Sequence, residues 1–163
     1  MHTKVRLLAG VIAAIVIPVV MVSCDDDITG IDEPTWTASM NAANERPVGA
    51  STATGTGTVV FVDNGTSIDW TMTLNNVTGV IFSHIHAPAT VDQNAPVIIN
   101  LFMPNGATGT LNGEIASGTI TDANNANVSL AALRAMLDAG TAYANVHTTQ
   151  FQPGAIRGQI IRD

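Results

Sequence analysis

Two strand-like segments on either side of a turn dipeptide constrain the fold of this chain more than any other feature. Residues 56–62 are mostly threonine and valine, and apolar residues occupy every second position of 68–74. The dipeptide Asn64-Gly65 between these segments is typical of a β-hairpin turn. The pattern therefore predicts two antiparallel strands, each with one buried face.

Turn residues divide the rest of the chain into further short strands. Eight strands are predicted, at 36–41, 56–62, 67–74, 80–86, 97–102, 113–121, 141–147 and 155–161, with turns at 44–47 and at Asn75-Asn76. One helix is expected, because Ser129 is a suitable N-cap, leucines follow at helical spacing and Gly140 can end it. We therefore predict an all-β fold, a Greek-key-like β-sandwich or barrel of about eight strands with one short helix.

The N-terminus has the layout of an export signal. Lys4 and Arg6 precede an apolar run at 7–22, and Ser23 stands directly before Cys24 as in a lipobox. We predict a lipoprotein signal peptide (1–23), lipid attachment at Cys24, an acidic flexible tether (24–34) and one domain (35–163), anchored in the cell envelope and facing the periplasm or the exterior. Two alternatives are a permanent membrane anchor, for which the run is short, and an ordinary free thiol.

Charge excludes one class of partner. After cleavage the chain would keep four arginines against thirteen carboxylates, a net charge of −9. Nucleic acids require clustered lysine and arginine, and this sequence has no such cluster, so we predict no nucleic-acid binding. Cys24 is the only cysteine, so the domain must form its core without an internal disulfide.

Histidines form the strongest candidate site. His84 and His86 lie two residues apart near the end of a predicted strand, so their side chains face the same side. His147, at the end of a later strand, is the only other histidine outside the signal peptide. Three neutral imidazoles with an open position suit copper or, alternatively, zinc. The alternative is that these histidines are ordinary surface or hydrogen-bonding residues.

Four segments together resemble the CHRD (chordin-type) domain in order and spacing, over about 36–161. They are Asn44-Glu45-Arg46-Pro47, Ser83-His84-Ile85-His86, the segment from Ala142 to Thr148, and Gly154-Ala155-Ile156-Arg157-Gly158-Gln159-Ile160. Val48 and Ala87 stand where the family often has proline and glycine, which affects the loops rather than the histidines. The family was first described in chordin, an extracellular binder of growth factors. The resemblance implies an extracytoplasmic β domain and supports the histidine cluster.

A weaker likeness is to copper–zinc superoxide dismutase, which is also a Greek-key β-sandwich. It has a His-X-His pair, a later copper-binding histidine and an arginine in a glycine-flanked segment. His84, His86, His147 and Arg157 follow the same order here, although the bridging histidine and the zinc ligands have no match. The likeness implies that Arg157 could guide a small anion such as superoxide; a structural ion pair is the alternative role.

Other candidates surround this set. Glu45 is expected to be a buried structural carboxylate that bonds backbone amides, or a partner for Arg157. Tyr143 and Asn145 share the face of His147 by strand parity, and they would support the ligands or pack in the core. Met103 could be an axial copper ligand, although core packing is expected.

Three hypotheses follow. The first is a lipid-anchored CHRD domain with one metal ion, most favourably copper, acting in redox defence, with superoxide dismutation as one activity. The second is a non-enzymatic module that binds a protein or a glycan. The third is a passive copper or zinc store.

Overall fold

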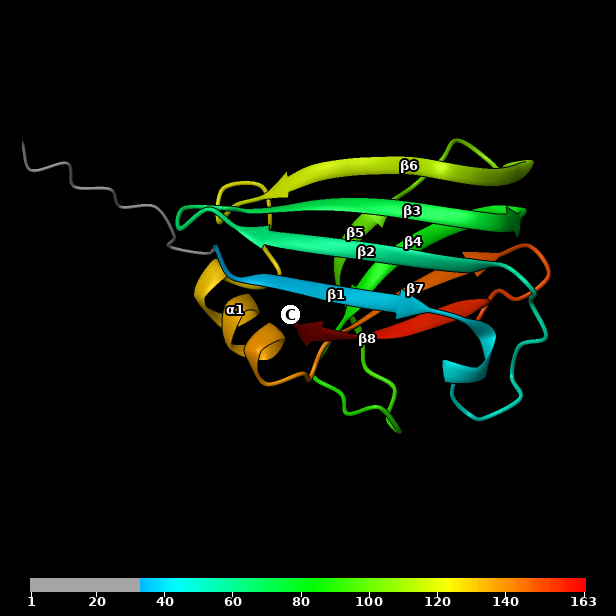
Figure 1. Cartoon of the computed structure of the whole chain (residues 1–163), viewed down its shortest axis with the longest axis horizontal. Helices are drawn as coiled ribbons and strands as arrows, with labels where there is room; N and C mark the ends of the chain where they lie inside the picture. Colours follow the sequence, from blue (N-terminus) through cyan, green and yellow to red (C-terminus); the bar gives the residue numbers. More distant parts are fainter. Residues whose placement is uncertain (1–32) are drawn as a thin grey trace, which may run out of the picture. The chain divides into compact units, whose positions relative to one another are not determined.

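The computed structural model describes residues 33–163, and one antiparallel sheet dominates this part of the chain (Figure 1). The strands are β1 (Thr35–Met40), β2 (Thr56–Asp63), β3 (Ile68–Thr78), β4 (Val80–His86), β5 (Val97–Phe102), β6 (Thr110–Ile120), β7 (Tyr143–Thr148) and β8 (Ile156–Arg162). The helices are η1 (Ala42–Asn44), a single 3₁₀ turn, and α1 (Leu130–Asp138). The predicted all-β class with eight strands and one short helix is confirmed.

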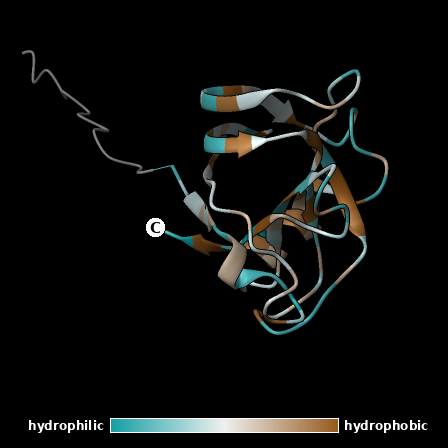
Figure 2. Cartoon of the chain, turned by 90° about the vertical axis from the view of Figure 1, so that its right-hand side faces the viewer, coloured by the Kyte–Doolittle hydropathy of each residue, from teal (hydrophilic) through white to brown (hydrophobic). Residues whose placement is uncertain are grey.

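The strand order is β5-β4-β7-β8-β1-β2-β3-β6, and every ladder is antiparallel. Because the sheet curls, its two end strands β5 and β6 approach each other and the sheet forms a nearly closed barrel (Figures 1 and 2). The side-chain amide of Asn127, in the loop after β6, donates to the Ile98 carbonyl of β5 at 3.3 Å across this seam. Of the two architectures predicted, the barrel describes the structure.

The barrel interior is apolar because alternate residues of each strand point inward. Trp36, Phe61, Met72 and Ile156 are typical members of the core and are almost fully buried. Leu133 and Leu137 of α1 join the same core. The helix therefore contributes its apolar face to the barrel core rather than forming a separate unit.

Local signals in the sequence account for the ends of α1. The Ser129 side chain accepts a hydrogen bond from the Ala132 backbone amide at 3.2 Å, as expected of an N-cap. Gly140 follows the helix with φ +62°, a conformation that glycine adopts without strain. Among residues 33–163 we find no helix of the length and apolarity needed to cross a membrane.

The turn predicted at Asn75-Asn76 is wrong, because β3 continues through both residues to Thr78. The ladder between β3 and β6 shifts register between Leu74 and Val77, which marks a bulge. Asn76 has φ +56°, which asparagine tolerates better than most residues. The chain reverses instead at Gly79, which has φ +70°.

The outer face of β4, β7 and β8 is unusual because it is polar and yet largely buried. Ser83, Ile85, Ala144 and Val146 are fully buried on the inward-facing side of β4 and β7. The outward positions of β7 are Tyr143, Asn145 and His147, and each of these is at most 8% exposed. Loops at 41–55, 87–96 and 149–155 contact this face, so it forms a second, polar layer outside the barrel core.

Candidate metal centre

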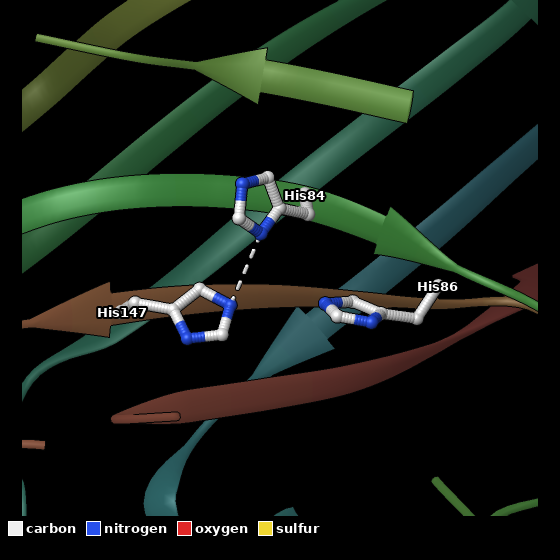
Figure 3. Close-up of side chains that lie close together, drawn as sticks. All are labelled: His84, His86 and His147. Atoms are coloured by element: carbon white, nitrogen blue, oxygen red, sulfur yellow. Dashed lines mark hydrogen bonds between the residues drawn. The ribbon is translucent and has the colours of Figure 1, made fainter. Parts of the chain in front are cut away.

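Two neighbouring strands bring the three predicted histidines together. His84 and His86 point outward from β4, and His147 points outward from β7 (Figure 3). The register pairs His84 with Asn145 and Phe82 with His147, so His147 lies diagonally across from His84. Each histidine offers one ring nitrogen, and these three atoms lie within 4.8 Å of one another. The residues present could therefore hold one metal ion.

Backbone carbonyls fix the orientation of two of the rings. Nδ1 of His86 lies 2.9 Å from the Ala95 carbonyl oxygen, and Nδ1 of His147 lies 2.8 Å from that of Gln152. A carbonyl oxygen can only accept, so both Nδ1 atoms carry the hydrogen. In the neutral rings, Nε2 then holds the lone pair that a metal requires. Nε2 of His86 is buried and has no hydrogen-bond partner in the described chain.

His84 completes the cluster with its other nitrogen. Its Nδ1 lies 3.2 Å from Nε2 of His147 (Figure 3). Because that Nε2 is an acceptor, Nδ1 of His84 donates to it in the metal-free chain. Metal binding through Nδ1 would move this hydrogen to Nε2 of the same ring, with no change in its charge. The ligand set would then be one Nδ1 and two Nε2 atoms.

All three imidazoles are held in the neutral form. Burial, followed by the neighbouring His147 and His86, lowers the pKa of His84 to about 4. Burial also lowers the pKa of His86 and that of His147, although the carbonyl hydrogen bonds oppose this shift. At neutral pH the site therefore presents lone pairs rather than positive charges. This is the protonation state in which histidine binds a metal.

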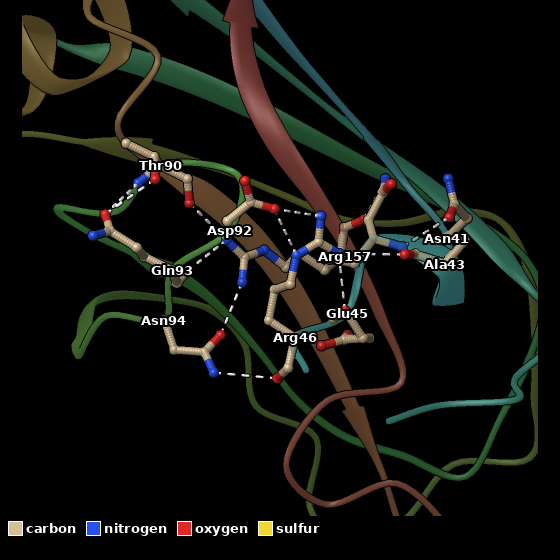
Figure 4. A network of polar contacts seen from close by, with 10 residues as sticks. Asn41, Ala43, Glu45, Arg46, Thr90, Asp92, Gln93, Asn94 and Arg157 are labelled. Carbon is tan, nitrogen blue, oxygen red and sulfur yellow. Dashed lines mark hydrogen bonds and ion pairs between the residues drawn. The ribbon is translucent and has the colours of Figure 1, made fainter. Parts of the chain in front are cut away.

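Arg157, a residue that we expected to guide an anion, is 1% exposed. The central carbon of its guanidinium lies 3.5 Å from the centre of the Tyr143 ring. His86 also stacks in parallel on Tyr143, with the two ring centres 4.8 Å apart. The guanidinium also donates to the Gln93 carbonyl at 2.7 Å, to Asn94 Oδ1 at 2.9 Å and to the Thr90 carbonyl at 3.3 Å (Figure 4). These contacts favour a positioning role, and the anion-guiding role stays a prediction.

Glu45 is buried on the same face, but its partner differs from the expected one. Both carboxylate oxygens accept from Nδ2 of Asn145, at 3.0 and 3.2 Å, rather than from backbone amides. Burial raises the pKa of Glu45 to about 7, against the opposing effects of Asn145 and of the positive Arg157 and Arg46. Gly154 packs so closely that a Cβ there would lie 2.5 Å from the carboxylate. Glu45 is therefore confined between Asn145 and Gly154.

Two candidates from the sequence remain. Cys24 is outside the described residues. Met103 is 59% exposed, so the expectation that it fills the core is wrong. It follows the end of β5, where its side chain is left outside the barrel.

The carbonyls of Ala95 and Gln152 are functional groups that the sequence reasoning missed. Every residue has a carbonyl, so no residue type marks them. One signal was available, because each belongs to the residue directly before a proline, Pro96 or Pro153. Proline restricts the preceding residue to extended conformations. Both prolines also lie in loops that cover the histidines.

Comparison with known proteins gives one result. The model of the CHRD domain family matches residues 36–160, which include both histidine-bearing strands and the loops over them. No curated protein and no solved structure gives a significant match. The match covers most of the chain, and this chain therefore belongs to the CHRD domain family.

Proposed function

We propose that this chain binds one copper ion, with Nδ1 of His84 and Nε2 of His86 and His147 as ligands. The observation that carries the proposal is the convergence of three ring nitrogens within 4.8 Å. Two further features support it. Backbone carbonyls hold the hydrogens of His86 and His147 on the nitrogens that face away from the cluster. Burial keeps all three rings neutral.

Copper is preferred over other metals for chemical reasons. Divalent copper binds nitrogen ligands more tightly than the neighbouring first-row ions, and imidazole suits both of its common oxidation states. Zinc accepts the same ligands and is the alternative. A protein that stores copper or zinc and a protein that uses copper in redox chemistry could both have these three ligands. The bound metal therefore has to be identified before an activity is assigned.

Metal titration tests the site directly. The parent protein should take up one equivalent of Cu²⁺, and His147→Ala should bind it at least tenfold more weakly. Glu114→Ala is the matched control, because it removes an exposed carboxylate that could bind metal nonspecifically on β6. Equal uptake by the parent and His147→Ala would contradict the proposed site.

Redox activity is a second proposal, carried by the exposure of one ligand. His84 is only half-buried, whereas His86 and His147 are 9% and 8% exposed. A small molecule could therefore approach from the side of His84, and copper would supply one-electron chemistry there. Superoxide dismutation is the activity to test. Activity of the copper-loaded protein no greater than that of peptide-chelated copper would leave the store or a binding module as the function.

We also propose that Cys24 anchors the chain to a membrane through a lipid. The support is the sequence alone: a positive N-terminus, an apolar run and Ser23 before the cysteine. Cys24→Ser should leave the precursor uncleaved or release the protein from membranes. A variant that is processed and sediments with membranes like the parent would contradict the anchor.

A further inference from the structure

One buried atom on the outer face of β7 lacks a partner, as does Nε2 of His86 on β4. The side-chain carbonyl oxygen of Asn145, Oδ1, has no hydrogen-bond donor in the described chain, although the residue is only 3% exposed. A buried carbonyl without a donor has lost the hydrogen bonds that water gives it in the unfolded chain, so such atoms usually have a partner. Any inference about that partner rests on the proposed metal site, because Asn145 lies beside two of the proposed ligands, His84 and His147.

The position of Asn145 brings its side chain beside the histidines. In the β4–β7 ladder it stands directly opposite His84, and in the β7–β8 ladder directly opposite Arg157. It also precedes His147 by two residues and shares its face. Directly opposed Cβ atoms in an antiparallel ladder lie about 4.5–5.5 Å apart. The amide is therefore close enough to act on a group bound at the cluster.

Glu45 determines which end of the amide is free. Both of its oxygens accept from Nδ2 of Asn145, so Nδ2 is held toward Glu45 and Oδ1 is the end left without a partner. If the amide turned over, Oδ1 would face a carboxylate and the two oxygens would repel. Glu45 cannot move back, because Gly154 lies against it. The pair therefore presents a fixed acceptor.

We infer that Asn145 Oδ1 accepts a hydrogen bond from a water molecule bound to the metal ion, and that Glu45 is the positioning residue that holds the amide in this orientation. A metal-bound water is a strong donor, which is the group that Oδ1 needs. The same arrangement selects among small ligands. Water has a hydrogen to donate, whereas an anion such as azide would bring another acceptor against Oδ1.

Glu45→Gln tests this orientation while preserving shape. The new amide can donate to Asn145 Oδ1, so the Asn145 side chain can turn and direct Nδ2 toward the metal. A donor would then replace an acceptor. We expect copper uptake to stay near that of the parent and azide affinity to rise about tenfold, as expected for one hydrogen bond gained where repulsion is lost. Azide binding is followed by the azide-to-copper charge-transfer absorption at pH 8, where most of Glu45 is ionised.

Asn145→Leu provides a second variant of similar volume, which removes the acceptor and should raise azide affinity by a smaller factor. Asn124→Leu is the control, because it removes an amide in the loop after β6 whose hydrogen-bond partners among residues 33–163 are Thr119 and Thr121. Copper uptake with unchanged azide affinity in both test variants would overturn the inference and leave the metal site standing. A parent protein that fails to bind copper would overturn both. A merely structural role for Glu45 would lower stability without changing azide affinity.

Discussion

Replacing Arg157 by glutamine separates a positioning role from an anion-guiding role. The arginine crosses from β8 to the loop at 87–96 and stacks on Tyr143, which in turn stacks on His86. Glutamine is shorter and uncharged, so it cannot reach all three acceptors in that loop. If Arg157 positions the loop, the variant should lose both stability and metal affinity.

The size of the stability loss follows from these contacts. Two of the hydrogen bonds, at 2.7 and 2.9 Å, have good lengths, and bonds from a charged donor contribute about 1.5–3 kcal/mol each. The cation–π contact adds about 1 kcal/mol, while removing a buried charge also removes its desolvation cost. We expect a net loss of about 3 kcal/mol in the free energy of unfolding. For a domain of this size that lowers Tm by about 10 °C.

Urea unfolding and copper titration measure the two effects. Copper affinity should fall about tenfold or more, since the Ala95 carbonyl that orients His86 lies in the loop that Arg157 holds. Arg157→Lys keeps the charge but not the planar fork, so it should recover only part of the loss. Unchanged stability and unchanged copper affinity in Arg157→Gln would refute the positioning role. If the superoxide rate alone fell, the guiding role would be correct.

Three further outcomes are expected. Burial raises the pKa of Glu45 from 4.5 to about 7, so between these pH values the folded chain binds a proton that the unfolded chain does not. The stability of the parent relative to Glu45→Gln should therefore increase by about 2 kcal/mol as pH falls from 7 to 4.5, and parallel pH profiles of the two proteins in urea unfolding would contradict this. Gly154→Ala should lower stability by about 2 kcal/mol because its Cβ would meet the Glu45 carboxylate, and adding Glu45→Ala should recover part of the loss in a double-mutant cycle. Because the pKa of every ligand histidine is lowered, copper affinity should begin to fall only below pH about 6.5, and half-loss already at pH 7 in a titration would rule this out.

The sequence predicted the histidine cluster because strand parity is a short-range rule. His84 and His86 share a face whatever the strand's neighbours are, and the distinctive segment ending at His147 pointed to the third ligand. The pairing of β4 with β7, more than fifty residues later, depends on the whole barrel and could not be read from either strand. The bulge at Asn76 was missed because two adjacent asparagines are as typical of a turn as of a bulge.

The roles of Arg157 and Glu45 were harder to predict because their partners come from loops. Sequence order suggested an arginine beside the metal, but the loop at 87–96 folds over the guanidinium and supplies three oxygen acceptors to it. The burial of Glu45 was expected, whereas its bond to Asn145 depends on how η1 places the following residue over β7. Loop conformation therefore limits prediction from sequence here, rather than the assignment of strands.

The site lies outside the barrel core, so its side chains are distinct from those that fill the interior. None of the three histidines, nor Glu45, Asn145 or Arg157, belongs to the apolar cluster that fills the barrel. Replacing His147 therefore leaves the apolar core intact, although it removes the hydrogen bonds that its ring makes with His84 and with the Gln152 carbonyl. A metal ion that binds only the folded chain would stabilise it in proportion to the logarithm of its concentration above Kd. The apolar interior therefore supports the eight strands, whereas the loops at 41–55, 87–96 and 149–155 provide groups that surround the histidines.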